Sequence, residues 1–338
     1  MNHSGIYGQT VIYNPQLPGG FVDGQDAINS VPDGGTFYLN GVWDCRDHGG
    51  IVLTRPINIE GAGWSFLNRG RLQGAYFLNE AASGPETVIE IDCTANQAMG
   101  VKLSNFGMVN LKGYGIVQRR TPNTVHRDLF FDCRGGRGAV QFGEGVFFTV
   151  ADNVIVQNFS HRGYDISGTG NDYTFRNCDI RSKHPTCEAG IYCVNSGLTV
   201  YQGQIEAVNE TGTGAGIYLF RDEAKRGRNA LLFGVYAENS DCAVRISGNY
   251  PWLGAQIIAP HWSLMLNEDG SRRRVGCGLA VENGEHIHLE RPQVYNWDNR
   301  CRVADLREGA ADCSVVLGRP GQSGKVRNLG RRNRVVDA

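Results

Sequence analysis

A short phrase, in which a small residue precedes alternating apolar and polar residues, recurs eight times between residues 115 and 306. Its first inward apolar residues are separated by 24, 24, 27, 26, 27, 35 and 24 positions. A period of roughly 20–50 residues indicates stacked units that cannot each bury a core alone. Alternation at period 2 indicates that each unit contains a β-strand. The anchors are Ile116, Val140, Tyr164, Ile191, Ile217, Val244, Leu279 and Val303.

A second strand-like phrase lies between the copies of the first, so each turn of about 25 residues carries at least two strands. Bends rich in Gly, Asn and Asp join them. No helical pattern long enough for a βαβ crossover separates them, and the interval is too short for a four-stranded propeller blade. The pattern therefore predicts a parallel β-helix of about 10 coils. The second phrases begin at Val154, Tyr173, Leu198, Ala230, Ala255 and Ile287.

Composition agrees with a turn-rich all-β chain, since 46 of the 338 residues are Gly and only 20% are charged. The formal net charge of −1 gives no general attraction for nucleic acid or membranes. The first 24 residues lack the pattern of a signal peptide, and no apolar run is long enough for a membrane helix. The ten cysteines form no CxxC pair, so we expect most to be reduced and buried, in a protein made in a cytoplasm. The Gly-rich stretches contain no nucleotide-binding motif, and no cofactor is expected.

Three regions are predicted along the chain. Residues 1–22 form an N-terminal arm with a short strand at Thr10 to Tyr13, residues 23–318 form the β-helix, and residues 319–338 form a basic C-terminal arm. A short helix from Asp23 to Val31 is expected to cap the open end of the solenoid. The 35-residue step contains an insertion with Trp262 and the charged run Asn267 to Val275, which is expected to form a loop on a binding face.

The opening of the predicted coils carries a resemblance. Two segments, Asp26 to Leu39 (DAINSVPDGGTFYL) and Ile57 to Gly63 (INIEGAG), resemble the start of pectate-lyase-like proteins, most of all the β-helix of phage tailspikes and minor tail proteins. The resemblance implies a right-handed, single-stranded β-helix that is often homotrimeric and usually binds polysaccharides. It implies a virion tail location, with other tail proteins and a bacterial surface polysaccharide as partners. It does not identify a reaction.

Alternation also predicts which side chains point outward. In the first strand series, Tyr192 and Tyr218 are expected to stack on adjacent coils between an acid, Asp165, and a base, Arg245. Exposed aromatic rings flanked by polar groups can bind sugars; the alternative is a side-chain ladder that only stabilises the sheet. The residues expected to contact glycan are Tyr192, Tyr218, Arg221, Arg245 and Trp262.

Cleavage of a glycosidic bond by hydrolysis requires two carboxyl groups. The candidates are Asp222 and Glu223, which end the Tyr218 strand, together with Asp165 two coils earlier. A second pair, Glu206 and Glu238, follows strands of adjacent coils. A lyase would instead need a base beside a cation, which Arg221 or Arg245 could supply. For each acid, a solvated loop residue is the alternative.

Metal binding is not expected. His286 and His288 lie on the same side of one predicted strand, and two imidazoles are too few for a zinc site. Two functions therefore stay open from the sequence. One is a trimeric, structural or glycan-binding phage tail protein, and the other is a β-helix polysaccharide lyase, glycoside hydrolase or glycan transferase.

Overall fold

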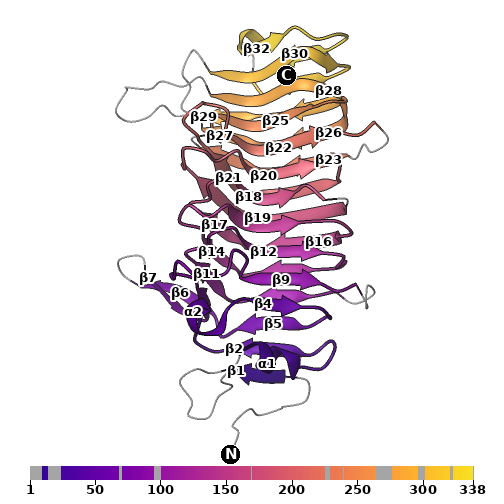
Figure 1. Ribbon diagram of the computed structural model, residues 1–338. Helices are drawn as coiled ribbons and strands as arrows, with labels where there is room; N and C mark the ends of the chain where they lie inside the picture. Colours follow the sequence, from indigo (N-terminus) through magenta and orange to yellow (C-terminus); the bar gives the residue numbers. More distant parts are fainter. Residues whose placement is uncertain are drawn as a thin grey trace, which may run out of the picture.

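The computed structural model describes residues 10–13, 24–67, 71–94, 100–168, 170–224, 229–238, 240–263, 276–295, 301–319 and 323–337. These residues form one right-handed parallel β-helix of about 11 turns. The coils stack along a single axis, with the N-terminal end at one pole and the C-terminal end at the other (Figure 1). The predicted fold class is confirmed. The insertion from Asn267 to Val275 lies outside the described residues.

Three columns of parallel strands make up the wall of the solenoid. The long strands β19 (Asn171–Ser182), β21 (Leu198–Ala207) and β28 (Cys277–Glu290) bend from one column into the next. Column A also contains β4 (Ile51–Leu53), β9 (Ile89–Asp92), β12 (Tyr114–Arg119), β15 (Gly138–Phe142), β18 (Arg162–Ile166), β20 (Ala189–Val194), β22 (Ala215–Arg221), β25 (Cys242–Gly248), β30 (Arg302–Ala311) and β32 (Val326–Asn328). Column B contains β1 (Thr10–Tyr13), β2 (Thr36–Leu39), β5 (Asn58–Gly61), β10 (Lys102–Ser104), β13 (Val125–Arg127), β16 (Phe147–Asp152), β23 (Ala230–Phe233), β26 (Trp252–Ile258), β31 (Ser314–Leu317) and β33 (Arg334–Asp337). Column C contains β3 (Val42–Asp44), β8 (Tyr76–Leu78), β11 (Gly107–Val109), β14 (Phe130–Asp132), β17 (Ile155–Gln157), β24 (Tyr236–Glu238), β27 (His261–Ser263) and β29 (Gln293–Tyr295).

The strand register follows the sequence repeat with two exceptions. Ile116, Val140, Tyr164, Ile191, Ile217, Val244 and Leu279 pair in that order on successive coils and are all buried. The last step is wrong by one residue, because Leu279 pairs with Ala304 instead of Val303. In the second series, Tyr173 pairs with Thr149, whereas Val154 immediately precedes β17 of column C. The predicted second strand series therefore mixes Val154, which belongs with column C, with strands of column B.

Eight of the corners from column B to column C contain a residue with a left-handed backbone. This conformation suits Gly and is tolerated by Asn and Asp, whose short side chains can bond locally. Such single-residue corners turn the chain without a long loop and keep the coils in register. Among the described residues, the corners are Asn105 (φ 61°), Asp128 (51°), Asn153 (53°), Asn177 (50°), Gln202 (56°), Gly234 (61°), Ala259 (46°) and Arg291 (48°).

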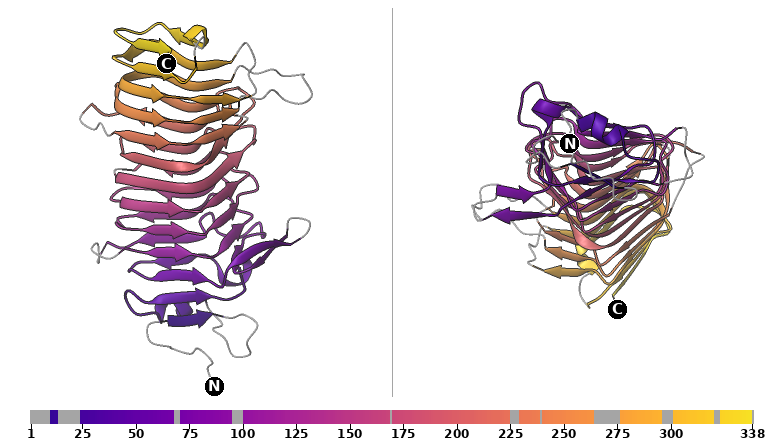
Figure 2. Two further views of the ribbon diagram at one scale, coloured as in Figure 1. Left: turned by 180° about the vertical axis from the view of Figure 1, so that it is seen from behind. Right: turned by 90° about the horizontal axis from the view of Figure 1, so that it is seen from below.

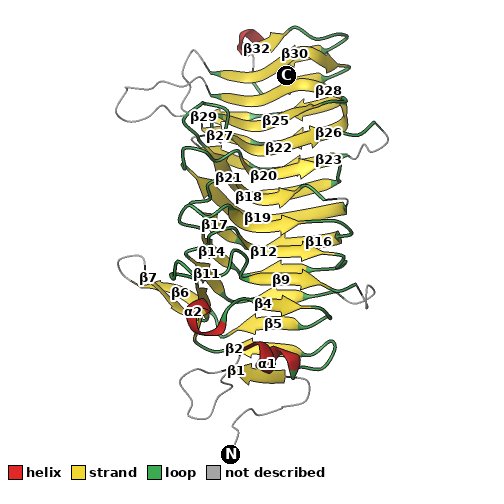
Figure 3. Cartoon of the chain, in the orientation of Figure 1, coloured by secondary structure: helices red, strands yellow, loops and turns green. Residues whose placement is uncertain are grey.

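Both ends of the solenoid carry additional elements. At the N-terminal end, α1 (Gly24–Asn29) buries Ala27 and Ile28, and β1 pairs with β2. α2 (Cys45–His48) and the antiparallel hairpin β6 (Trp64–Leu67) and β7 (Arg71–Gly74) project from the early coils (Figures 2 and 3). At the C-terminal end, a 3-10 helix (Ser323–Lys325) precedes β32 and β33, which pair with β30 and β31. Within the predicted C-terminal arm (residues 319–338), β32 and β33 therefore add further parallel strands to the solenoid.

Candidate functional site

The outward row of column A has the predicted register. Asp165, Tyr192, Tyr218 and Arg245 pair consecutively on four coils, so the two tyrosines do lie between an acid and a base. Their rings meet edge to face, with centroids 5.2 Å apart and an interplanar angle of 83°. Pairing of parallel strands therefore brings together residues that are separated by about 25 positions in the sequence.

The tyrosine rings are nevertheless covered. Tyr192 and Tyr218 are only 8% and 9% exposed. The Arg162 guanidinium lies 3.4 Å from the centroid of the Tyr192 ring, and that of Arg245 lies 4.9 Å from the Tyr218 ring. The Tyr218 hydroxyl is hydrogen-bonded to Ser247 Oγ at 2.8 Å. Cation–π contacts thus occupy ring faces that a sugar would need, which matches a stabilising ladder better than an open platform.

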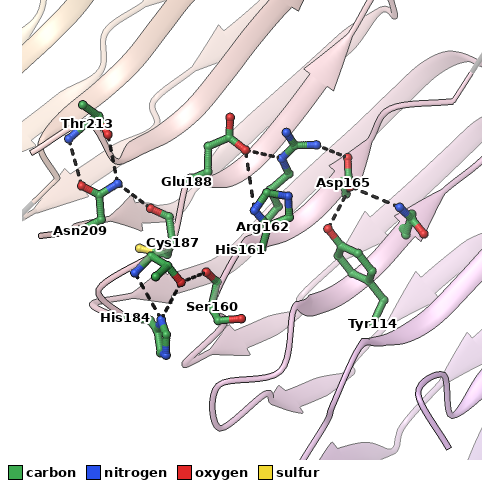
Figure 4. A network of polar contacts seen from close by, with 12 residues as sticks. Tyr114, Ser160, His161, Arg162, Asp165, His184, Cys187, Glu188, Asn209 and Thr213 are labelled. Carbon is green, nitrogen blue, oxygen red and sulfur yellow. Dashed lines mark hydrogen bonds and ion pairs between the residues drawn. The ribbon is translucent and has the colours of Figure 1, made fainter. Parts of the chain in front are cut away.

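Asp165 is the centre of a buried polar network (Figure 4). It is 2% exposed, and its Oδ2 accepts hydrogen bonds from the Tyr114 hydroxyl at 2.9 Å and from Gln141 Nε2 at 3.4 Å. Arg162 donates to Asp165 Oδ1 at 3.0 Å and also to Glu188 Oε2 at 2.7 Å. Both carboxylate oxygens are therefore engaged, and the network holds adjacent coils together, as a satisfied buried ion pair does.

Asp222 and Glu223 are not brought to Asp165. Asp222 lies four residues beyond Tyr218, which is about 13 Å along the strand direction, whereas Asp165 is level with Tyr218 two coils away. That separation exceeds the roughly 9.5 Å that an inverting pair of carboxyl groups allows. Asp222 instead exchanges hydrogen bonds with the Asn195 side chain on the neighbouring coil. Asp165 therefore lies apart from Asp222 and Glu223, with which it was predicted to form one site.

The remaining predicted contact residues have different environments. Arg221 is 6% exposed and donates to the backbone carbonyls of Pro251 (2.5 Å), Glu223 (3.1 Å) and Ala224. Such bonds tie the end of β22 to its neighbouring loops.

Trp262 lies in the core and is fully buried. A Cβ placed on Gly278 would come within 2.2 Å of its ring, which shows how closely the backbone packs on it. The expected glycan contact by Trp262 is therefore wrong, because no ring face is accessible. Arg245 binds Glu282 at 3.1 Å beside a cavity on column A.

The second carboxylate pair does share one cavity, on the outer face of column C. Gln204 of β21 pairs with Tyr236 of β24, so Glu206 and Glu238, each two residues further on, lie side by side on adjacent coils. The cavity has a volume of about 340 Å³, enough for a sugar residue. Its lining is polar and comprises Gln157, Asn158, Arg181, Ser182, Lys183, Gln204, Glu206, Val208 and Glu238.

The environment of Glu206 raises the pKa of its carboxyl. Glu206 is 4% exposed, and burial is the main cause of the rise; the charge of Glu238 acts in the same direction. Its Oε1 accepts hydrogen bonds from Gln204 Nε2 at 2.8 Å and from the Glu238 backbone N–H at 2.5 Å, and both bonds oppose the rise in pKa without reversing it. Both bonds go to one oxygen, so Oε2 has no partner among the residues described.

Cations lie beside this pair. Arg181 is 43% exposed and forms an ion pair with Asp179 at 2.5 Å, and Lys183 is exposed. The pocket therefore combines a buried carboxyl group whose pKa is raised, a second carboxyl group on the next coil and positive charge at the rim. A pair of carboxyl groups is what hydrolysis of a glycosidic bond uses.

Metal ligation receives no support within the described ranges, where no group of three His, Cys, Asp or Glu side chains is close enough to hold an ion. His288 contacts Ser314 Oγ at 2.6 Å and Glu290 at 3.6 Å, and His286 is exposed. Likewise, no helix in this part of the chain is long and apolar enough to cross a membrane.

No family model and no curated protein sequence matches the chain. Solved structures do match in fold. Tailspike protein 2 from the Escherichia coli O157:H7 bacteriophage CAB120 gives a TM-score of 0.59 at 13% identity, over 87% of this chain and 39% of the tailspike. This chain therefore spans well under half of the tailspike's length.

A second group of similar structures is a DFA-IIIase from Arthrobacter chlorophenolicus A6. Its C387A mutant in complex with DFA-III gives a TM-score of 0.65 at 11% identity, covering 97% of this chain and 98% of the enzyme. The complex with GF2 also gives 0.65, at 12% identity, over 94% and 96% of the two chains. At such identities these similarities establish the right-handed parallel β-helix, and the resemblance to tailspike-like β-helices is confirmed at the level of fold.

Proposed function

We propose that this protein binds a polysaccharide and hydrolyses its glycosidic bonds in the pocket of Glu206 and Glu238. The observation that carries the proposal is the pair of carboxyl groups on adjacent coils in one cavity of about 340 Å³, with the pKa of the more buried one raised by burial. Two of the similar structures support the choice of class. One is the enzymatically active domain of a phage tailspike, and another is the enzyme DFA-IIIase.

In this mechanism Glu206 is the general acid. Its Oε2 donates a proton to the glycosidic oxygen as the bond to the anomeric carbon breaks, and the neutral carboxyl suits a site from which water is partly excluded. Glu238 is the carboxylate that faces the positive charge developing on the sugar ring. A water molecule then adds to the anomeric carbon, and the proton it loses returns to the carboxyl pair, which restores the enzyme. Gln204 fixes the Glu206 carboxyl by its hydrogen bond to Oε1, and Arg181 and Lys183 offer hydrogen bonds or charge to the substrate.

The test is product release from a panel of neutral and acidic bacterial surface polysaccharides, followed by reducing-end assay and mass spectrometry. Glu206→Gln and Glu238→Gln should each lower the rate by about 10²–10⁴-fold while the protein remains folded by circular dichroism. Glu308→Gln, at an exposed carboxyl on a distant coil, is the matched control and should retain the wild-type rate. Cleavage that survives in Glu206→Gln would refute the assignment.

We further propose that the protein belongs to a phage tail and assembles as a homotrimer. The tailspike similarity supports the location. An exposed apolar row on column B supports assembly. Tyr201 (40% exposed) pairs with Phe233 (43%), which pairs with the half-buried Ile258. Neighbouring aromatic side chains left open to water at the middle of a sheet are typical of an interface.

Light scattering during gel filtration tests the assembly. The wild type should elute with three times the 37.0 kDa mass of one chain, and the double variant Tyr201→Ser, Phe233→Ser should shift toward monomer. Val52→Ser removes an equally exposed apolar side chain on an early coil of column A and serves as the control. A wild-type monomer would contradict the homotrimer, and it would leave the Glu206 pocket to be judged by its own assay.

A further inference from the structure

Two cysteines on adjacent coils lie side by side near the C-terminal end of column A. Cys242 of β25 pairs in register with Cys277 of β28. Each thiol also donates to the carbonyl two residues further along its strand, to Val244 at 3.1 Å and to Leu279 at 3.2 Å. Among the strand pairs that the structure describes, this is the one in-register pair of cysteines.

The other eight cysteines have a different environment. All eight are buried. Cys277, by contrast, is partly exposed, and Cys242 is 8% exposed. The buried thiols are Cys45, Cys93, Cys133, Cys178, Cys187, Cys193, Cys301 and Cys313.

A cavity of about 350 Å³ on the outer face of column A gives access to the pair. Both Cys242 and Cys277 line it. Arg302 pairs with Cys277 on the next coil, and Arg327 lines the same cavity. The cavity therefore gives a small oxidant a route from solvent toward the pair. Arg302 lowers the pKa of the Cys277 thiol, but Asp305, which lines the same cavity, raises it.

Strand geometry permits a covalent link between these residues. In-register residues on adjacent strands lie about 4.8 Å apart, and a disulfide needs Cα atoms roughly 4.4–6.8 Å apart. The bond would join coils across the 34 residues that separate the two cysteines (277 − 242 − 1). It would connect β25 to β28 across the longest step of the sequence repeat.

We propose that Cys242 and Cys277 form a thiol–disulfide exchange site that closes to an inter-coil disulfide with a small disulfide oxidant such as oxidised glutathione. One thiolate attacks the oxidant, forms a mixed disulfide and releases one thiol. The second thiolate then displaces the other half of the oxidant. The two cysteines lose two protons and two electrons, and the oxidant is reduced to two thiols. This inference is independent of the Glu206 pocket.

The pH dependence of closure should be steep. Interaction with the neighbouring Cys242 thiol and then burial raise the pKa of Cys277; Asp305 adds to the rise and Arg302 opposes it. Because the thiolate is the attacking species, closure should be slow near neutral pH and should accelerate as the pH rises toward 9.

The experiment treats the native protein with oxidised glutathione, removes the oxidant, records the intact mass, then denatures the protein, blocks the remaining thiols with iodoacetamide and maps tryptic peptides. The expected result is an intact mass lower by about 2 Da, a linked peptide containing Cys242 and Cys277, and eight alkylated cysteines of the original ten. Cys193→Ser, in the core, should leave the link unchanged, whereas Cys242→Ser should abolish it.

If Cys242→Ser fails to fold, Cys277→Ser serves in its place, because either folded single variant should stop at a mixed disulfide on the cysteine that remains. Three results would overturn the proposal. These are ten free thiols after prolonged oxidation at pH 9, a lasting mixed disulfide on one cysteine of the wild type, or linkage that involves any of the other eight cysteines.

Discussion

Replacing His126 by phenylalanine should make the β-helix less sensitive to acid. His126 lies in the interior of β13, is fully buried, and neither ring nitrogen has a partner among the described residues. Its ring stacks on Phe142 with centroids 5.8 Å apart and an interplanar angle of 13°. Burial lowers the pKa of His126 to about 3, from an ordinary value of 6.5, because the core cannot solvate an imidazolium.

The sign of the effect follows from the two protonation states. Between about pH 3 and 6.5 the unfolded chain binds a proton at this site and the folded chain does not, so stability falls as the pH falls through that range. Each pH unit costs about 1.4 kcal/mol. At pH 5, 1.5 units below the ordinary pKa, the wild type should therefore have lost about 2 kcal/mol from this residue relative to pH 7.5.

Urea denaturation at pH 7.5 and pH 5.0 measures the loss. The His126→Phe protein should keep about 2 kcal/mol more of its stability between the two pH values than the wild type does, since phenylalanine preserves the stack on Phe142 and cannot titrate. His286→Asn changes an exposed histidine (φ 57°) to a residue that tolerates its backbone conformation, and it should behave as the wild type does. Equal acid losses in the wild type and His126→Phe would refute the reasoning, because they would show that the core accommodates the charged ring.

Two further predictions concern stability. Asp165→Asn should lower the free energy of unfolding by about 3 kcal/mol in urea denaturation, because it leaves the buried Arg162 guanidinium with one carboxylate partner fewer. Polysaccharide cleavage per folded molecule should stay at the wild-type level. A loss of cleavage without a loss of stability would instead make Asp165 catalytic. Ala259 lies at a corner with φ 46°, in the left-handed region that glycine adopts more readily than alanine. Ala259→Gly should therefore raise the free energy of unfolding by about 0.5–1 kcal/mol, measured from the urea midpoint. An unchanged or lower midpoint would show that the left-handed alanine is not strained.

The sequence predicted the fold because the repeat is a direct record of strand pairing. Residues such as Ile191, Ile217 and Val244 occupy the same position in each turn, and stacking at one register is the arrangement that buries them all. The strands of column C were harder to predict from the sequence pattern. They are mostly three residues long, and a single left-handed residue such as Asn153 separates them from column B, so periodicity alone merges the two.

The candidate site was predicted only in part, for a related reason. Alternation places Tyr192 and Tyr218 outside the core, but it carries no information on whether a side chain such as Arg162, thirty positions earlier than Tyr192, covers them. Glu206 and Glu238 were named from their positions after strands of adjacent coils. What distinguishes Glu206 from other acids is its burial in a shared cavity, which depends on the register of β21 with β24.

The central claim is that Glu206 is a proton donor set beside a second carboxyl group. It is tested most directly by following the side-chain carboxyl of Glu206 through a pH titration by ¹³C NMR, with Glu206→Gln used to assign the signal. The account predicts a midpoint above the ordinary glutamate value of about 4.3, which moves down in Glu238→Gln because a neighbouring negative charge has been removed. A midpoint at or below the ordinary value in the wild-type protein would contradict it, since such a carboxyl would have no proton to give to a leaving sugar.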